Sequence, residues 1–134
     1  MHHRALAGSL WFALLVWACA ILWLSSLTPQ EMPDAAFVLW DKMNHVAAFA
    51  VGGWLAASSL GLTRPTASPV GRIVLAVLAV IAVAAFGALD EAVQTFTPGR
   101  AGGDIYDWVA DLLGATAGAA LSLAAFGRLE RLAR

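Results

Sequence analysis

Two adjacent acids and an amide, Asp90, Glu91 and Gln94, lie at the end of a long apolar segment. Nothing interrupts a helix before Pro98, so these side chains are predicted to occupy its last two turns and to face similar space. Acids at a helix C-terminus oppose the helix dipole, and broken local rules tend to mark functional sites. Arg100 follows after a short loop and is a candidate to pair with either acid or to bind a phosphate or carboxylate. A solvated helix end is the simpler alternative.

A second cluster, Asp41, Lys42 and His45, opens another apolar segment. Asp41 can cap a helix that begins here, and His45 follows four residues later on the same face. An ionisable group one turn into an apolar segment is expected to face the protein interior or water. We therefore take His45 and Glu91 as candidate general bases, and Asp41 and Lys42 as candidate substrate-binding residues.

The third cluster, Asp104, Asp107 and Asp111, is spaced as one helical stripe. Asp104 or Asp107 can cap the helix that follows. Asp111 lies a turn inside an apolar segment, where an unpaired acid costs several kcal/mol. Three basic side chains are its expected partners: Arg100, Lys42 and His45. Binding roles are predicted for Asp107 and Asp111, as for Asp90 and Gln94, because helix packing would bring all three clusters into one polar basin.

The elements that must position these clusters are four apolar segments, about residues 6–27, 44–62, 73–96 and 107–126. Each comes close to the roughly 20 residues that cross a bilayer as a helix. The backbone must satisfy its own hydrogen bonds in lipid, which favours helices, and strand-like alternation is missing. The composition agrees, since 60% of the residues are hydrophobic and 13% are charged. The sequence predicts an all-α fold: one domain, residues 1–134, forming a polytopic membrane bundle of four transmembrane helices.

Small residues recur every four positions on one face of the last segment: Ala110, Gly114, Gly118 and Ser122. Such a face lets helix backbones approach closely, and the pair Gly52 and Gly53 is expected to act likewise in the second segment. The same kind of contact leaves a helix-mediated homo-oligomer open. Trp17, in the middle of the first segment, is expected to serve packing.

The basic residues fall unevenly about the four segments. Six of the eight lie on one side, namely Arg4, Arg64, Arg72, Arg128, Arg131 and Arg134. Only Lys42 and Arg100 lie on the other side, together with eight of the nine acids. Positively charged loops stay in the cytoplasm, so both termini are predicted to be cytoplasmic and the polar basin to face outward from the inner membrane.

Other features narrow the class of protein. The net charge is −1 and no basic stripe is present, which argues against a nucleic-acid partner. The first apolar run is longer than a signal-peptide core, so we expect an uncleaved helix. The single cysteine, Cys19, lies inside this run and is expected to be a small buried hydrophobe.

At these clusters the chain resembles the VanZ-like family of small bacterial membrane proteins. An Asp-Glu-x-x-Gln-x-Phe-x-Pro-x-Arg motif is complete over residues 90–100, and an Asp-Lys-x-x-His motif covers residues 41–45. A Ser-x-x-Pro element occupies residues 26–29. The closing Asp-x-x-x-Asn-x-x-Gly pattern spans residues 107–114, with Asp111 where the family usually has Asn. The resemblance implies an envelope membrane protein, in a family named for resistance to the glycopeptide teicoplanin, and it brings no settled activity.

Three functions remain in competition. The first is a protein that binds or remodels a lipid-linked or cell-wall component, with Arg100 and Lys42 on its anion, and that lowers glycopeptide susceptibility. The second is a membrane enzyme using His45 or Glu91 on a lipid-linked or peptidoglycan-related substrate; whether the protein is an enzyme stays open. The third is a structural ion-pair network. No cofactor is expected, although a divalent cation on Asp90, Glu91, Asp107 and His45 is left open. Membrane lipids are expected partners.

Overall fold

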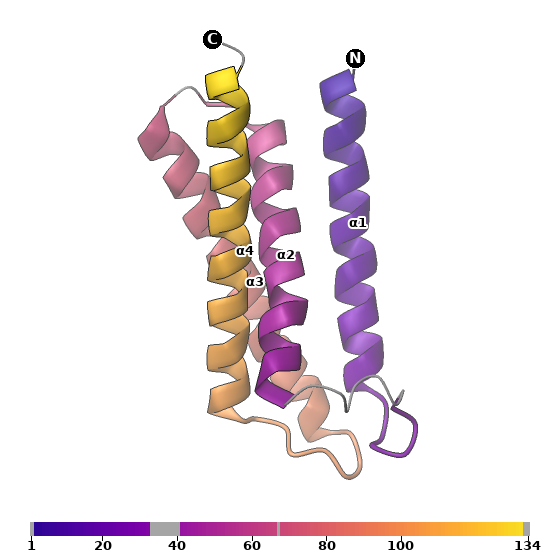
Figure 1. Ribbon diagram of the computed structural model, residues 1–134. Coiled ribbons are helices and arrows are strands. Elements are labelled where there is room, and N and C mark those ends of the chain that lie inside the picture. The colour runs from indigo at the N-terminus through magenta and orange to yellow at the C-terminus, as the bar shows by residue number, and fades with distance from the viewer. Residues whose placement is uncertain (1, 33–40, 67, 133–134) are drawn as a thin grey trace.

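The computed structural model describes residues 2–32, 41–66 and 68–132. Within these ranges the chain forms four α-helices and no strand: α1 (His2–Ser25), α2 (Asp41–Thr63), α3 (Pro69–Thr95) and α4 (Ile105–Leu132) (Figure 1). Each helix contains a stretch that is long and apolar enough to cross a membrane. The prediction of an all-α fold with four such helices is confirmed.

Capping residues explain why α3 and α4 begin earlier than residues 73 and 107. Ser68 accepts a hydrogen bond from the backbone N–H of Gly71 at 3.3 Å, and Pro69 stands in the first turn, where its missing N–H is not needed. Asp104 accepts a hydrogen bond from the backbone N–H of Tyr106 at 2.7 Å. Asp104 is therefore the cap of α4, one of the two residues proposed for this role from the sequence.

The helices alternate in direction, which divides the bundle into two ends. The C-termini of α1 and α3 and the N-termini of α2 and α4 lie at the bottom of Figure 1, here called the lower end. The start of α1 and the end of α4 lie together at the upper end. The first helix therefore begins, and the last helix ends, at the same end of the bundle, as an even number of alternating helices requires.

The closest pair of helices is α2 and α4, which run side by side through the centre of the bundle (Figure 1). All four small residues of the predicted α4 face are buried: Ala110, Gly114, Gly118 and Ser122. A methyl group added at Gly114 would overlap the carbonyl oxygen of Val46 on α2, and one added at Gly53 would overlap the backbone of Ala115 on α4. The small-residue contact predicted from the sequence therefore forms between these two helices.

Helix α1 packs at the side of the bundle, against α2 and more lightly against α3. Trp17 attaches α1 to α2. Its indole Nε1 donates to the carbonyl oxygen of Ala48 at 2.9 Å, and its ring packs edge-on against Phe49 with 5.5 Å between the ring centroids. Gly52 leaves room for this ring, because a methyl group there would overlap it. The packing role predicted for Trp17 is confirmed.

The rest of α1 turns outward. Large apolar side chains of α1 are exposed in the isolated chain, as lipid-facing residues are: Trp11, Phe12, Leu15, Val16 and Trp23. Cys19 is also exposed, so the expectation that it is buried was wrong. The error arises because α1 uses only one narrow side for packing, and Cys19 is not on that side.

Candidate functional site

Polar side chains from all four helices meet at the lower end of the bundle. Five members of the predicted basin are at least nine-tenths buried there: Asp90, Glu91, Gln94, Asp107 and Asp111. The alternating helix directions explain the meeting, because the end of α3 and the starts of α2 and α4 carry these residues. Buried polar groups at this density must be satisfied by one another, so each contact matters for stability.

His45 and Asp111 connect α2 to α4. The ring nitrogen Nδ1 of His45 lies 2.8 Å from Oδ1 of Asp111, and Asp111 is fully buried. Of the three partners predicted for Asp111, the structure selects His45. A buried carboxylate on one ring nitrogen fixes the orientation of the imidazole and leaves the other nitrogen for a ligand or a proton.

Lys42 forms a second link between α2 and α4. Its ammonium group donates to Asp104 at 2.7 Å and also forms an ion pair with Asp107. The hydrogen bond from Lys42, with further help from the N–H of Tyr106, lowers the pKa of Asp104 below its ordinary value. With two carboxylates already on its ammonium group, Lys42 holds helices together and is poorly placed for the anion-binding role predicted for it.

Asp90 is held by residues from two helices. Ser25, at the C-terminus of α1, donates to Oδ1 of Asp90, and Gln94 donates to Oδ2 at 3.1 Å. Thr97 also contacts Ser25, because its hydroxyl donates to the Ser25 carbonyl oxygen at 2.9 Å. Ser25 and Thr97 are members of the cluster that were not predicted from the sequence. The only signal was a serine at the end of an apolar helix, and its partner depends on how α1 is rotated.

Glu91 reaches from α3 towards the start of α4. Its Oε2 accepts the backbone N–H of Asp104 at 2.9 Å, whereas Oε1 has no hydrogen-bond partner in the described part of the chain. Asp111 shows the same imbalance, because Oδ2 is buried without a partner. Two carboxylates are thus only half satisfied in the interior of the cluster.

Two predicted site residues lie outside this network. Arg100 is half-buried in the segment between α3 and α4, and no hydrogen bond or ion pair involves its guanidinium group in the part of the chain that the structure describes. Arg100 is near enough to Asp90 for electrostatic attraction, but no ion pair of Arg100 with Asp90 or Glu91 is present among the described residues. Asp41 is exposed as the first residue of α2.

Comparison with known proteins adds one finding. A family model described as VanZ/LLP1 matches residues 10–126, which cover α2 and α3, most of α1 and α4, and every member of the cluster. The chain belongs to the VanZ family. It is accordingly a multi-pass membrane protein. No curated protein and no solved structure matches it with statistical significance.

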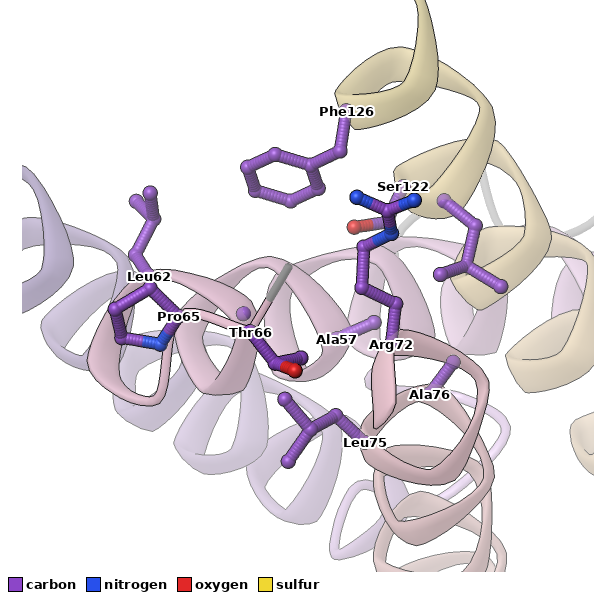
Figure 2. A pocket seen from close by; sticks show the side chains of 11 residues that line it. Ala57, Leu62, Pro65, Thr66, Arg72, Leu75, Ala76, Ser122 and Phe126 are labelled. Carbon is purple, nitrogen blue, oxygen red and sulfur yellow. The ribbon is translucent and has the colours of Figure 1, made fainter. Parts of the chain in front are cut away.

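This VanZ family protein has a separate cavity of about 490 Å³ near the upper end, between α2, α3 and α4 (Figure 2). Its lining is mainly apolar, with Leu62, Leu75 and Phe126 among the walls and Arg72 as the charged side chain. The cavity contains none of the predicted site residues. The concentration of ionisable groups therefore places the candidate site of this VanZ family protein at the lower end.

The lower-end cluster offers two sets of side chains that could hold a metal ion. The first is Asp41, His45 and Asp107, and the second is His45, Glu91 and Asp111. In each set the three ligand atoms lie within 4.8 Å of one another. His45 belongs to both sets, so the two sets differ in which carboxylates would join it.

Proposed function

We propose that this protein acts in the cell envelope, in the cytoplasmic membrane, by binding the anionic headgroup of an envelope lipid or lipid-linked precursor with Arg100. The observation that carries the proposal is the contrast between two cations of the lower end. Lys42 already pairs with Asp104 and Asp107. Arg100 makes no such pair in the described chain, and a guanidinium group can bind a phosphate or carboxylate through two parallel hydrogen bonds.

The charge distribution supports an outward-facing lower end. Arg4 and Arg72 lie near the upper end, and Arg64 lies in the segment that joins α2 to α3 there. Arginines close to membrane helices favour the cytoplasmic side, so the lower end would face the outer leaflet, where it meets envelope lipids and their carried groups.

Cysteine labelling tests this orientation. In a Cys19→Ala background, Ala101→Cys reports on the lower end and Arg64→Cys on the upper end; both positions are exposed. A membrane-impermeant maleimide added to intact cells should label Ala101→Cys, whereas Arg64→Cys should react only after permeabilisation. The reverse pattern would place the candidate site in the cytoplasm and end the proposal.

Native mass spectrometry of the purified protein tests the anion contact. The probes are farnesyl phosphate, phosphatidylglycerol and, as the uncharged comparison, farnesol. A charge-assisted hydrogen-bond pair contributes about 1.5–3 kcal/mol, so Arg100→Gln should weaken binding of a phosphate probe by about tenfold or more. Arg64→Gln removes a cation from the other end and should change nothing.

The three probes separate the sources of the anion. Preference for farnesyl phosphate over phosphatidylglycerol would indicate a prenyl-linked precursor, and the opposite preference would indicate a bulk phospholipid. Equal binding of farnesol and farnesyl phosphate, or unchanged binding by Arg100→Gln, would refute an anion contact at Arg100. In cells, we expect the wild type to raise the teicoplanin concentration needed to inhibit growth and Arg100→Gln to abolish that effect.

One observation favours the enzymatic alternative. His45 is oriented by the buried Asp111, as a general base is oriented by a carboxylate. Ser25 is not its nucleophile, since its hydroxyl donates to Asp90. Release of inorganic phosphate from farnesyl diphosphate by the wild type, lost in a His45→Gln variant that circular dichroism shows to be folded, would establish turnover. Binding without phosphate release from this probe would support the simpler proposal.

A further inference from the structure

Two buried carboxylates at the lower end each keep one oxygen without a partner. Glu91 is 5% exposed, and its Oε1 accepts no hydrogen bond from the residues that the structure describes; Asp111 is fully buried, and the same holds for its Oδ2. An unsatisfied buried acceptor destabilises the folded protein, and more so when the group is charged. Two such oxygens in one cluster indicate that a bound ligand satisfies these two acceptors.

The unsatisfied side of Asp111 faces α3, the helix that carries Glu91. A Cβ added at Gly87 would lie 2.7 Å from Oδ2 of Asp111, so this oxygen sits directly against the backbone of α3. Glu91 follows Gly87 by four residues, one turn further along the same face of α3. The missing side chain at Gly87 therefore leaves room for the Asp111 carboxylate beside Glu91.

His45 completes the group. One nitrogen of His45, one oxygen of Glu91 and one oxygen of Asp111 lie within 4.8 Å of one another. Two ligands that share a zinc ion at about 2.1 Å each are at most about 4.2 Å apart, so a small side-chain rotation brings all three onto one ion. The residues come from α2, α3 and α4, which makes their approach a product of the fold rather than of one local motif.

We propose that His45, Glu91 and Asp111 bind one divalent transition-metal ion, Zn²⁺ or Mn²⁺. An imidazole suits zinc and carboxylates suit manganese, so this mixed set favours these ions over Mg²⁺ and Ca²⁺, which take oxygen ligands. Three protein ligands leave further coordination positions open to water or to an incoming headgroup. The ion also supplies the positive charge that the two half-satisfied carboxylates lack.

The other metal-ligand sets are less suitable. The set of Asp41, His45 and Asp107 uses a carboxylate already paired with Lys42 and one that is exposed at the start of α2. The ion suggested by sequence alone also used Asp90, but Ser25 and Gln94 occupy both oxygens of that residue. Only the set with Asp111 has unsatisfied oxygens among the residues that the structure describes.

Metal binding to the full chain in neutral detergent tests the proposal. The protein is stripped with EDTA, desalted, and titrated with MnCl₂ while the electron paramagnetic resonance signal of free Mn²⁺ is followed. A parallel sample is loaded with ZnCl₂, passed through gel filtration and analysed for zinc. The wild type should bind one ion per chain, and Glu91→Gln and Asp111→Asn should each weaken binding by about tenfold or more.

The conservative variants keep the hydrogen bonds, since the amide oxygen of Glu91→Gln still accepts the N–H of Asp104. Circular dichroism checks that they remain folded, and the wild-type stoichiometry does not depend on any variant. Asp41→Asn is the matched control and should bind as the wild type does. A wild type that binds neither ion would overturn the proposal, as would loss of binding by Asp41→Asn with retention by Glu91→Gln.

The metal site and the anion contact at Arg100 use different residues. Arg100→Gln should keep its metal, because Arg100 is not one of the three ligands, and headgroup binding measured in EDTA reports on Arg100 without the ion. Failure of the metal titration therefore leaves the headgroup proposal intact, and failure of the headgroup assay leaves the metal site intact.

Discussion

His45 on α2 and Asp111 on α4 meet through Nδ1 and Oδ1 at 2.8 Å, although the two residues are 66 positions apart in the sequence. The contact depends on how closely the two helix backbones approach, since Asp111 is a short side chain. Small residues on α4 permit that approach, so the packing of the two helices determines the geometry of the polar cluster.

We expect His45→Ala to destabilise the protein strongly. Removing one partner of a buried pair leaves the other charge uncompensated, at a cost of about 3–5 kcal/mol. Asp111→Ala should cost a similar amount, and the double variant should cost less than the sum of the two by about 1 kcal/mol or more. The free energy of unfolding by sodium dodecyl sulfate in mixed micelles with EDTA is the measurement; strict additivity would show that the two side chains are not coupled.

Ser25→Ala should weaken the attachment of α1 to α3. The Ser25 hydroxyl donates to the buried Asp90, and losing that donor leaves a carboxylate oxygen unsatisfied at a cost of about 1–3 kcal/mol. Ser26→Ala is the neighbouring control, because Ser26 is exposed just after α1 and its hydroxyl donates to the carbonyl oxygen of Trp23 near the end of that helix. The same unfolding assay should separate the two variants, and equal effects would mean that the Ser25–Asp90 contact contributes little.

The ion pair of Lys42 and Asp104 predicts a pH dependence of stability. Lys42 and the capping N–H of Tyr106 lower the pKa of Asp104 from 3.8, so folding favours its charged form. Such a group stabilises the protein at pH values above its unfolded pKa, and the contribution is lost as the pH falls through the lower folded pKa.

The variant Asp104→Asn isolates this charge, because Asn is an equally good helix cap. The difference in free energy of unfolding between wild type and Asp104→Asn should be constant above about pH 5 and shrink below pH 3.8. Added salt should reduce it, since the pair is partly exposed. A difference that stays flat down to pH 2 would contradict this assignment.

The four helices and the meeting of the polar clusters could be predicted from the sequence because both follow from local patterns. Apolar length fixes the helices, and alternating direction through the membrane sends Asp41, Glu91 and Asp107 to the same end. The small-residue face of α4 is likewise visible as a period of four residues. None of these inferences needs the rotation of any helix about its own axis.

The partners of individual side chains could not be predicted, because they depend on those rotations. Sequence alone allowed Asp111 three partners, left Lys42 available for an anion and placed Cys19 in the interior. Lys42 turns instead towards Asp104 and Asp107, and α1 presents Ser25 to the cluster while Cys19 faces outward. If one helix were rotated about its axis by the angle of a single residue, its polar side chains would meet other partners. The apolar pattern of the sequence would be the same.

Because α2 and α4 approach closely, an alanine at position 114 is expected to destabilise the protein. Alanine normally favours a helix over glycine by up to about 1 kcal/mol, and this holds for Gly8→Ala on α1, where an added methyl group has nothing within 4 Å. Gly114→Ala should do the opposite and cost about 1–3 kcal/mol, because its methyl group overlaps the Val46 carbonyl oxygen and lies 3.0 Å from the backbone nitrogen of Ala50. Backbone atoms of a helix cannot rotate away as a side chain can, so the two helices must separate.

That separation should also disturb the polar cluster, because Asp111 lies one turn before Gly114 on α4. We therefore expect Gly114→Ala to lower Mn²⁺ affinity as well as the free energy of unfolding, and Gly8→Ala to leave the affinity unchanged. Loss of stability without loss of affinity would show that the cluster tolerates a change in helix spacing. In that case side-chain flexibility, rather than the fixed distance between α2 and α4, would determine how His45 meets Asp111.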